Sequence, residues 1–442
     1  MAKAKSKKIT LEEALVPVEE QPYEVPENWC WTYLLNGFAE CKDGNRKPIN
    51  ASERAEREGD IPYYGATGQA GWIDDYLTDE QLVLLGEDGA PFLELLKDKA
   101  YLIEGKAWVN NHAHIIKSHY GEVGNKYILH YLNVFNFHGY VNGTTRLKLT
   151  QASMRTIPVP LPPFAEQKRI VEQIESLFAK LDMAREKAEF VISCFEERMV
   201  AIIHKAFEGV LTRKWREENN VSCDSWKMVP LKNCGRWFGG GTPTTSVGAY
   251  WEKGDIPWIT SKDMKDRVVE DSIMHITMAG VENSSANYCD EPAVLFVMRS
   301  GILRRVFPVC MVNRPFTVNQ DLKACVPAMN QDYLYWFCNG YEKDIRDKCM
   351  KSGTTVESVE AKKLMDYEVP VASANEQTEV VKQIESLINK EESVKELAKN
   401  VIEKIDAMKK LILAKAFRGE LGTNASSEEN SIELLKKTIE EG

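Results

Sequence analysis

Apolar residues recur at alternating steps of four and three in two long stretches of the chain. The first row starts at Ile170 and is broken at Arg198, and the second runs from Val380 to Ile412 with Glu391 as a charged intrusion. This spacing is the heptad pattern of helices that pack through an apolar seam. Proline-containing extended sequence precedes each row, as is typical of a helix start. The pattern predicts two helices of about 35 to 45 residues, each roughly 50 to 65 Å long at 1.5 Å per residue.

The two rows belong to an internal repeat. Residues 171–177 (VEQIESL) return 210 positions later as residues 381–387 (VKQIESL), and residues 205–211 and 415–421 share the pattern KAFxGxL at the same offset. Two helices of matching periodicity can bury their seams against each other. A pseudo-twofold axis between the repeats makes the pair antiparallel, so we expect an intramolecular antiparallel coiled coil. The alternative is that each helix packs only on its own domain.

The segments before the helices, about 20–155 and 220–365, have a different pattern. Short β-like apolar runs, such as residues 81–85 and 293–298, alternate with Gly, Pro and Asn turns and with short helical stretches. These segments predict irregular α/β globules that have diverged more than the helices. The expected fold class is therefore α+β, with two globular α/β domains separated by two long antiparallel helices in a pseudo-twofold repeat.

The expected domain boundaries follow from these changes of pattern. They are 1–155 for an N-terminal arm and the first globular domain, 156–215 for the first long-helix region, 216–365 for the second globular domain, 366–425 for the second long-helix region and 426–442 for a C-terminal tail.

The composition is typical of a soluble protein with several domains. The 442 residues are 43% apolar and 28% charged, which is enough for more than one hydrophobic core. No run approaches the roughly 18 apolar residues of a membrane span, and the lysine-rich start leads into no apolar signal core, so we expect a cytoplasmic protein without a membrane partner. The ten cysteines are scattered without a CxxC pair, which indicates neither a disulfide framework nor a zinc site.

The charge is unevenly distributed along the chain. The net charge of -10 argues against a polyanionic partner, because nucleic-acid-binding proteins commonly have a basic surface. Residues 106–155, however, contain six Lys or Arg against Glu122 alone, and residues 293–330 contain five against Asp321 alone. One basic zone in each half suits two phosphate-facing surfaces. Solvated basic faces without a ligand are an equally compatible interpretation.

Several loops combine small flexible residues with aromatic and hydrogen-bonding ones. They are residues 61–72 (IPYYGATGQAGW) in the first half and residues 239–244 (GGGTPT) and 254–264 in the second. Side chains of these types suit base edges and phosphates in a DNA groove. Ordinary turns have the same composition, so each loop alone is weak evidence.

Taken together, these features resemble the DNA specificity (S) subunit family of type I restriction-modification systems, over nearly the whole chain. The residues that carry the resemblance are 61–72, 160–167 (PLPPFAEQ), 211–216 (LTRKWR), 240–243, 256–258, 299–303 and 414–421 (AKAFRGEL). The family implies two target recognition domains, each reading one half of a split site in double-stranded DNA. It also implies that the helices set the gap and dock two methyltransferase (M) subunits, with restriction/translocase (R) subunits as further partners.

The resemblance also implies a chain that is not an enzyme and holds no cofactor or metal, with S-adenosylmethionine, ATP and Mg on the partner subunits. The candidate DNA-contacting residues are Tyr63, Tyr64, Thr67, Gln69, Trp72, Lys106, Asn110, Asn111, His112, Thr144, Thr145 and Arg146 in the first half, and Thr242, Thr244, Trp258, Thr260, Ser261, Lys262, Arg299, Ser300, Arg304, Arg305, Asn319, Gln320, Lys351, Thr354 and Thr355 in the second. The candidate spacer and partner-docking residues of the helices are Ile170, Ile174, Leu177, Leu181, Phe195, Phe207, Ile384, Leu387, Ile405 and Phe417.

Other functions have weaker signals. The only Pro-Pro-Phe, residues 162–164, follows a leucine rather than the Asn or Asp of an adenine methyltransferase, and no Walker phosphate loop occurs. Glu87 and Asp88, followed by Glu104 and Lys106, form a nuclease-like pattern in which acids hold Mg²⁺. This pattern is common by chance and has no match in the second half. An adapter that binds only proteins remains an alternative.

Five of the seven histidines lie between residues 112 and 138. A metal site is disfavoured there because no carboxylate or cysteine lies at ligand spacing. Contact of His112 with DNA is the favoured interpretation of this cluster.

Overall fold

The computed structural model describes residues 9–94, 97–351 and 356–441. The chain forms two compact units, Met1–Ala188 with Asn400–Gly442 (unit 1) and Glu189–Lys399 (unit 2). The long helices α5 (Phe164–Ser193) and α12 (Ala374–Ala416) each contribute to both units. No described helix is long and apolar enough to cross a membrane. The units differ from the five expected segments, because each takes in part of the helices.

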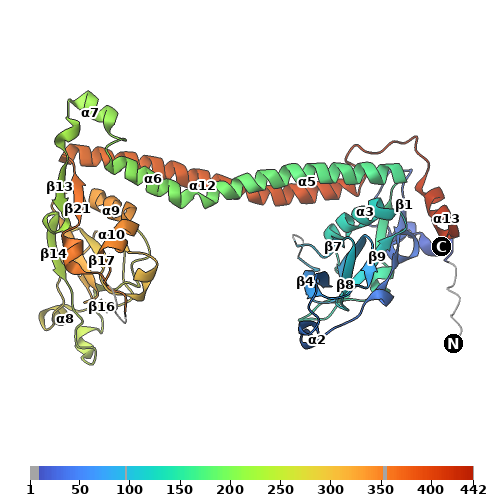
Figure 1. Ribbon diagram of the computed structural model, residues 1–442, viewed down its shortest axis with the longest axis horizontal. Coiled ribbons are helices and arrows are strands. Elements are labelled where there is room, and N and C mark those ends of the chain that lie inside the picture. The colour runs from blue at the N-terminus through green and yellow to red at the C-terminus, as the bar shows by residue number, and fades with distance from the viewer. Residues whose placement is uncertain (1–8, 95–96, 352–355, 442) are drawn as a thin grey trace. The chain divides into compact units, whose positions relative to one another are not determined.

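Unit 1 contains two four-stranded sheets in addition to its helical segments (Figure 1). Its elements are α1 (Leu11–Ala14), β1 (Cys30–Tyr33), β2 (Ala39–Cys41), α2 (Ala51–Ala55), β3 (Ile61–Gly65), β4 (Gly68–Ile73), β5 (Thr78–Asp79), β6 (Leu82–Gly86), β7 (Ala100–Ile103), β8 (Lys106–Val109), β9 (Ala113–Ser118), α3 (Gly121–Val134), β10 (Val141–Asn142), β11 (Lys148–Leu149), α4 (Gln151–Arg155), β12 (Pro158–Leu161) and α13 (Ser431–Glu441).

The first sheet of unit 1 has the order β2-β9-β6-β7, and the second has the order β4-β3-β8-β5. β6 is buried along its whole length, as its apolar sequence requires, and α3 packs against β6, β7 and β9. β3 and β8 run parallel, with Tyr63 opposite Trp108. The carboxyl ends of β3 and β8 therefore point the same way, and the loops that follow them meet at one edge.

Unit 2 repeats this plan. Its elements are α6 (Phe195–Phe207), α7 (Arg213–Asn219), β13 (Lys227–Pro230), β14 (Gly235–Gly239), β15 (Ile256–Ile259), β16 (His275–Ile276), α8 (Met278–Glu282), β17 (Ala293–Val297), β18 (Val309–Val312), β19 (Thr317–Val318), β20 (Leu322–Pro327), α9 (Gln331–Gly340), α10 (Glu342–Cys349), α11 (Ala361–Met365) and β21 (Glu368–Val371). The sheet β14-β20-β17-β18 corresponds to β2-β9-β6-β7, and the parallel pair β15 and β19 corresponds to β3 and β8. The predicted α+β class with two α/β domains is confirmed.

The long helices pair antiparallel in both units. In unit 1, Lys409 Nζ lies 2.5 Å from Asp182 Oδ1, and Arg185 bonds to Asp406. Residue numbers therefore rise along α5 as they fall along α12. In unit 2, the ammonium of Lys395 lies 3.9 Å from the centre of the Phe195 ring, and Arg198 bonds to Glu391, so the numbers again run in opposite directions. The expected antiparallel pairing is confirmed within each unit.

The two charged residues that interrupt the apolar rows bond to each other. Arg198 Nε lies 2.6 Å from Glu391 Oε2, and Arg198 Nη2 donates to the carbonyl of Val191 at 2.9 Å. The first helix is also interrupted here, because α5 ends at Ser193 and α6 begins at Phe195. The expectation of one continuous helix is wrong at this point. A charged pair inside an apolar seam can fix its register, because any slip leaves both charges unpaired.

A buried carboxylate lies at the start of the first long helix. Glu166 is fully buried and accepts hydrogen bonds from Trp29 Nε1 at 2.7 Å, Asn424 Nδ2 at 2.9 Å and Thr423 Oγ1 at 3.2 Å. Thr423 and Asn424 follow the end of α12. The start of one helix is thereby tied to the chain that leaves the other.

The second long helix repeats this arrangement in unit 2. Glu376 is fully buried and accepts from Thr212 Oγ1 at 2.9 Å and from Arg216 Nη1 at 2.7 Å. Thr212 and Arg216 follow the end of α6, as Thr423 follows the end of α12. The repeat therefore preserves a polar lock as well as an apolar seam.

The seam residues named from the sequence are mostly buried. Ile170, Ile174, Phe195, Phe207, Ile384, Ile405 and Phe417 are each no more than 5% exposed, and Leu177, Leu181 and Leu387 are half-buried. Side chains that pack inside the units offer little surface to another protein. A different set of helix residues is exposed: Met183, Phe190, Val200, Val394, Leu397, Val401, Met408 and Leu411.

The segment 426–442, expected as a tail, contains the helix α13. Leu435 of α13 is fully buried and packs on the π-helix Leu34–Phe38, and Ser431 Oγ donates to the carbonyl of Asn28 at 3.0 Å. The amphipathic sequence of residues 431–441 is the signal that identifies this helix. The C-terminal segment is therefore part of unit 1.

We expect Glu376→Ala to lower the free energy of unfolding by about 3–5 kcal/mol, because it leaves the guanidinium of Arg216 buried without its acceptor. The matched control is Glu396→Ala on the same helix, whose exposed partner Lys399 lies 3.4 Å away and whose loss costs about 0–1 kcal/mol. Urea unfolding followed by tryptophan fluorescence measures both. Equal losses would contradict the locking role of Glu376.

Candidate nucleic-acid interface

Three strand ends meet at one edge of unit 1. The backbone N–H of Asn110, after β8, donates to the carbonyl of Tyr64 in β3 at 3.1 Å. The N–H of Glu87, after β6, donates to the carbonyl of His112 at 2.8 Å. These bonds join the loops that follow β3, β6 and β8 into one surface, which we call edge 1.

Unit 2 has the same bonds at the corresponding strand ends. The N–H of Asn319, after β19, donates to the carbonyl of Ile259 in β15 at 3.0 Å, and the N–H of Met298, after β17, donates to the carbonyl of Asp321 at 2.8 Å. We call this surface edge 2. The pairing makes Asn319 equivalent to Asn110, Asp321 equivalent to His112, and Arg299 equivalent to Asp88.

The two equivalent asparagines hold the backbone. Asn110 and Asn319 are each 8% exposed. The Oδ1 atom of Asn110 accepts from the N–H of His112 at 2.8 Å, and that of Asn319 accepts from the N–H of Asp321 at 3.1 Å. These two candidate DNA contacts shape their loops and present little of their own surface.

The next pair at each edge has reversed polarity. In unit 1, His112 Nδ1 and Arg146 Nη2 lie 2.9 and 2.6 Å from Asp88 Oδ1. In unit 2, Arg299 Nε lies 3.3 Å from Asp321 Oδ1. The basic residue of the pair, His112, follows β8 in unit 1, whereas the acidic residue, Asp321, follows β19 in unit 2. The same frame therefore presents opposite charges at equivalent positions.

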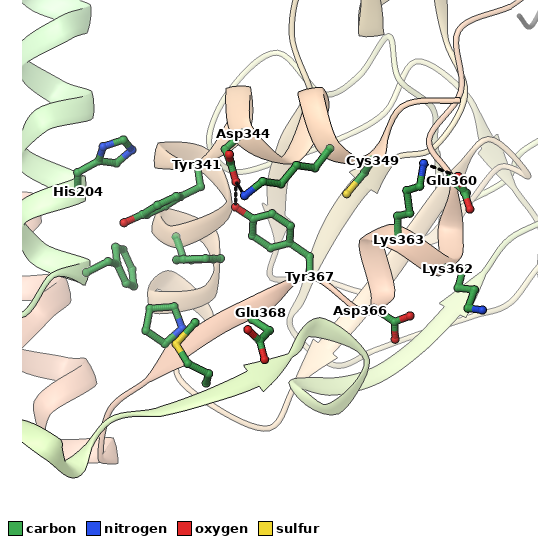
Figure 2. Close-up of a pocket in the computed structure, with 15 residues that line it drawn as sticks. His204, Tyr341, Asp344, Cys349, Glu360, Lys362, Lys363, Asp366, Tyr367 and Glu368 are labelled. Carbon is green, nitrogen blue, oxygen red and sulfur yellow. Dashed lines mark hydrogen bonds and ion pairs between the residues drawn. The ribbon is translucent and has the colours of Figure 1, made fainter. Parts of the chain in front are cut away.

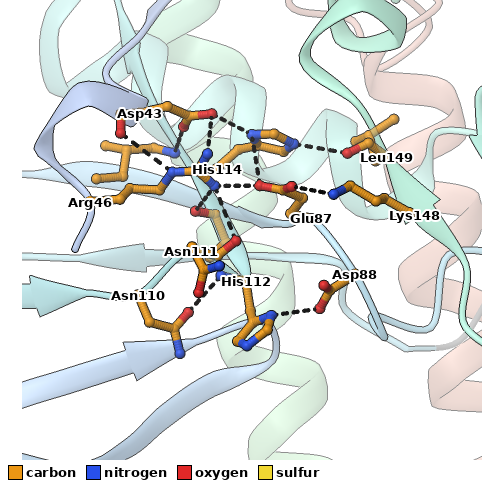
Figure 3. Close-up of polar contacts among 12 residues, drawn as sticks. Asp43, Arg46, Glu87, Asp88, Asn110, Asn111, His112, His114, Lys148 and Leu149 are labelled. Carbon is orange, nitrogen blue, oxygen red and sulfur yellow. Dashed lines mark hydrogen bonds and ion pairs between the residues drawn. The ribbon is translucent and has the colours of Figure 1, made fainter. Parts of the chain in front are cut away.

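A half-buried acid–base network lies behind edge 1 (Figure 3). Arg46 bonds to both Asp43 and Glu87, and Lys148 Nζ lies 2.9 Å from Glu87 Oε1. Burial acts to raise the pKa of Glu87, but hydrogen bonds from Arg46 and Lys148 more than offset it, so the pKa lies below its ordinary value. The carboxylate of Glu87 stays ionised and anchors the loop after β6.

His114 is the cation at the centre of this network. It is 2% exposed, with Nδ1 2.6 Å from Asp43 Oδ2 and Nε2 3.0 Å from the carbonyl of Leu149. Both partners are acceptors, so both ring nitrogens carry protons. Burial acts to lower the pKa of His114, but the bonds to Asp43, Cys41 and Leu149 raise it to about 9. The imidazolium joins β9 to β11.

Most of the candidate residues of unit 1 gather at or beside edge 1. Thr67, Thr145 and Arg146 line an open hollow of about 620 Å³ beside residues 89–94. Gln69, Asn111 and Thr144 are exposed. Two candidates lie away from this edge. Lys106 begins β8 and packs over the ring of Tyr76, and Trp72, 56% exposed, lies opposite Pro62 near the start of β3.

Two pairs of candidate residues in unit 2 contact each other. Thr242 donates to Gln320, and Ser261 Oγ lies 3.5 Å from Ser300 Oγ. Thr260 Oγ1 donates to Asp263 at 2.8 Å, in the loop that presents Lys262. The other exposed candidates are Thr244, Arg299, Arg304, Arg305 and Lys351. Thr354 and Thr355 lie outside the described residues.

Two aromatic candidates are core residues. Tyr63 is 2% exposed and donates to the carbonyl of Ile49, and Trp258 is 8% exposed and donates to the carbonyl of Gly241. They occupy equivalent positions, opposite Trp108 in β8 and Thr317 in β19. An aromatic residue beside glycine turns suggested a base contact, but the strand register turns both rings inward. Tyr64 is half-buried against Tyr101.

The nuclease pattern is not assembled. Glu104 follows Ile103, which pairs with Leu82 at the start of β6, whereas Glu87 follows the other end of β6. Five residues of strand separate these ends by roughly 16 Å, too far for one ion. Glu87 and Asp88 are instead held by basic side chains.

A second possible metal group lies within the acid–base network. The ligand atoms of Cys41, Asp43 and His114 lie within 4.8 Å of one another. Both nitrogens of His114 face acceptors, and Arg46 Nη2 lies 2.9 Å from Asp43 Oδ2. Ligand atoms that already make hydrogen bonds, one of them to a guanidinium, do not suit a metal ion.

The basic zones counted along the sequence are largely neutralised by acids from elsewhere in the chain. Lys117 pairs with Glu80, Lys126 with Glu175 and Arg304 with Glu357. A linear window misses these partners because they are distant in sequence. Sequence reasoning likewise missed Asp43, Arg46, Asp263 and Glu357, whose roles no local motif reveals.

Known proteins are similar to this chain in both units. The family model of the type I restriction modification DNA specificity domain matches residues 26–189 and 224–404. The Type I restriction enzyme EcoR124I/EcoR124II specificity subunit of Escherichia coli is 29% identical over 266 residues, which are 58% of this chain and 61% of that protein. The EcoDI specificity subunit of Escherichia coli is 21% identical, over 83% of this chain and 84% of that protein.

Solved structures share the fold. The HsdS subunit from Thermoanaerobacter tengcongensis has a TM-score of 0.60 at 17% identity, over 91% of this chain and all of that one. A chain from a study of complex assembly and conformational transition of the type I R-M system has a TM-score of 0.61 at 16% identity, over 90% of this chain.

We expect the stability of unit 1 to fall with rising pH because of His114. Its pKa of about 9 lies above the ordinary 6.5, so the stabilisation is full below pH 6.5 and is lost as pH rises through about 9, by up to about 3 kcal/mol. His114→Gln, which cannot carry the charge, should remove this dependence. Urea unfolding from pH 6 to 9.5 compares the two, and parallel curves would contradict the imidazolium assignment.

Proposed function

The chain belongs to the family of type I restriction-modification DNA specificity proteins, and on that premise we propose that it reads a split site in double-stranded DNA. Edge 1 and edge 2 each read one half-site. The chain is the non-catalytic subunit of a methyltransferase and endonuclease complex. Loop side chains discriminate between bases, and Lys and Arg contact phosphates.

The observation that carries the proposal is the repeated edge. Equivalent backbone bonds hold the same three strand ends in both units, yet the side chains presented there differ. Asp88 with His112 in unit 1 is replaced by Arg299 with Asp321 in unit 2. A constant frame with altered polar groups suits two different half-sites, because base edges are distinguished by their donors and acceptors.

The partners follow from the same proposal. Two methyltransferase subunits dock on the exposed apolar residues of the helices, such as Phe190, Leu397 and Leu411, which are 56–68% exposed. Restriction/translocase subunits complete the complex. S-adenosylmethionine, ATP and Mg belong to those partners, and the complex works in the cytoplasm. The boundaries 1–155, 156–215, 216–365, 366–425 and 426–442 are our proposed division of these roles along the chain.

A protein-only adapter is the second candidate. The exposed apolar residues of the helices favour it, because they suit protein partners whether or not the units bind DNA. The two candidates differ in their response to salt, since phosphate contacts release counterions and weaken steeply as salt rises. Absence of sequence preference on random duplexes would favour the adapter.

We expect Arg146→Ala and Arg299→Ala to relax recognition of different half-sites. Each removes an exposed guanidinium from one edge, so each should cost about 1–3 kcal/mol of discrimination at one half-site. Selection from a random duplex library, with the chain bound to its methyltransferase partners, measures both. Arg57→Ala and Arg236→Ala are controls away from the edges. Loss at both half-sites from one variant would contradict the assignment.

Shortening both helices tests the spacer. Residues 180–186 face residues 405–411, as the pairing of Asp182 with Lys409 shows. Deleting both segments removes about 10 Å of helix, or about three base pairs. We expect the gap between half-sites to shorten while both half-sites stay unchanged. Deleting only one segment breaks the register and should abolish binding. A changed half-site sequence would count against this role.

A further inference from the structure

Unit 2 contains an open groove of about 1130 Å³ that the DNA-reading edge does not use (Figure 2). Its aromatic lining comes from Phe207, Phe337, Tyr341 and Tyr367. Met228 on β13 also lines it and is 57% exposed. Phe207 and Phe337 are buried, so Met228 and the half-buried Tyr341 and Tyr367 form the accessible apolar part of the groove.

The strand register identifies the equivalent place in unit 1. Met228 lies opposite Pro370 in β21, as Trp31 lies opposite Pro160 in β12. Phe207 corresponds to Phe417 in the sequence repeat. The groove of unit 2 therefore matches the surface around Trp31 and Phe417 in unit 1.

In unit 1 this surface is covered by the N-terminal arm of the chain, residues 9–26. The N–H of Val16 donates to the carbonyl of Trp31 at 3.0 Å, and Leu15 forms an antiparallel bridge with Thr32. Trp31 Nε1 donates to the carbonyl of Tyr23 at 3.2 Å, and their rings lie 4.8 Å apart, edge to face. The arm leaves Trp31 only 1% exposed.

Unit 2 has no such cover among the described residues. β13 pairs with β21 alone, so its outer edge has free backbone groups, as β1 would have without the arm. The apolar lining and the open strand edge are the two features that a polypeptide segment binds when it adds a strand to a sheet.

The charges around the two surfaces differ. In unit 1, the guanidinium of Arg418 lies 5.0 Å from the centre of the Tyr23 ring. The repeat places Glu208 at the position of Arg418, and Glu368 lines the groove. Neither Glu208 nor Glu368 has an ion pair among the described residues. Three lysines also line the groove, and two of them, Lys348 and Lys363, pair with Asp344 and Glu360. Only Lys362 is left to balance Glu208 and Glu368, so the remaining charge is net negative and suits a basic occupant.

We propose that this groove docks an extended segment of a partner protein that carries an aromatic residue flanked by basic ones. The segment pairs with the outer edge of β13 and places its ring beside Met228, as Tyr23 lies beside Trp31. Its basic side chains neutralise Glu208 and Glu368.

A labelled peptide tests the proposal on the full chain. The probe has the sequence of residues 10–26 with Glu20→Lys and Glu24→Lys, and fluorescence anisotropy measures its binding. We expect saturable binding that weakens at least tenfold for the Met228→Lys and Glu368→Lys chains and for a probe with Tyr23→Ala. The unaltered acidic sequence should also bind at least tenfold more weakly.

Met278→Lys is the matched control, because Met278 is 46% exposed on α8, outside the groove. It should bind the probe as the unaltered chain does. Equal binding by the Met228→Lys chain, or no saturable binding at millimolar peptide, would overturn the proposal. Self-association of the chain that Met228→Lys abolishes would instead assign the groove to a second copy and overturn the partner assignment. DNA binding, which uses edge 2, should be unchanged in the Met228→Lys chain.

Discussion

Two buried carboxylates, Glu166 and Glu376, connect the beginning of each long helix to the chain that leaves the other. Each is fully buried and is held by a threonine that follows the end of the opposite helix, Thr423 or Thr212. A buried charge is tolerated only where its hydrogen bonds are made. The helices must therefore pair in the sense that brings these groups together, which apolar seam residues alone do not specify. The strand pairs β1 with β12 and β13 with β21, which adjoin the helix starts, depend on the same placement.

The rest of each unit is a frame whose backbone hydrogen bonds are the same in the two units, whereas the polar side chains that it presents differ. The N–H to carbonyl bonds that join the strand ends recur at 3.1 and 3.0 Å and at 2.8 and 2.8 Å in the two units. Between them, Asp88 with His112 becomes Arg299 with Asp321. Backbone bonds do not depend on side-chain identity, so recognition can diverge without loss of the fold. The N-terminal arm and the groove of unit 2 show the same divergence at another surface.

The sequence predicted this frame well, and the candidate contact residues stay predictions whose positions in the fold are now known. The heptad rows and the repeat identified the helices and their pairing, and even Arg198 and Glu391, the two exceptions in the rows, bond to each other. Thr67, Arg146, Thr242 and Gln320 lie at or beside edges 1 and 2. Tyr63 and Trp258 are buried instead, because an aromatic residue in a short strand looks the same in sequence whether the strand turns it inward or outward. The nuclease pattern failed because residues 87 and 104 lie at opposite ends of β6.

The periodic and the repeated features could be read from the amino-acid sequence alone: two long helices, their matching seams and two α/β domains. These depend on local spacing, which a linear pattern records directly. The folded chain was needed to show which charges are paired, which aromatic rings are buried and which surface is open. Such facts depend on residues far apart in the chain, as Lys126 with Glu175, Asp43 with His114 and Trp29 with Glu166 show. No short window of sequence contains both members of these pairs.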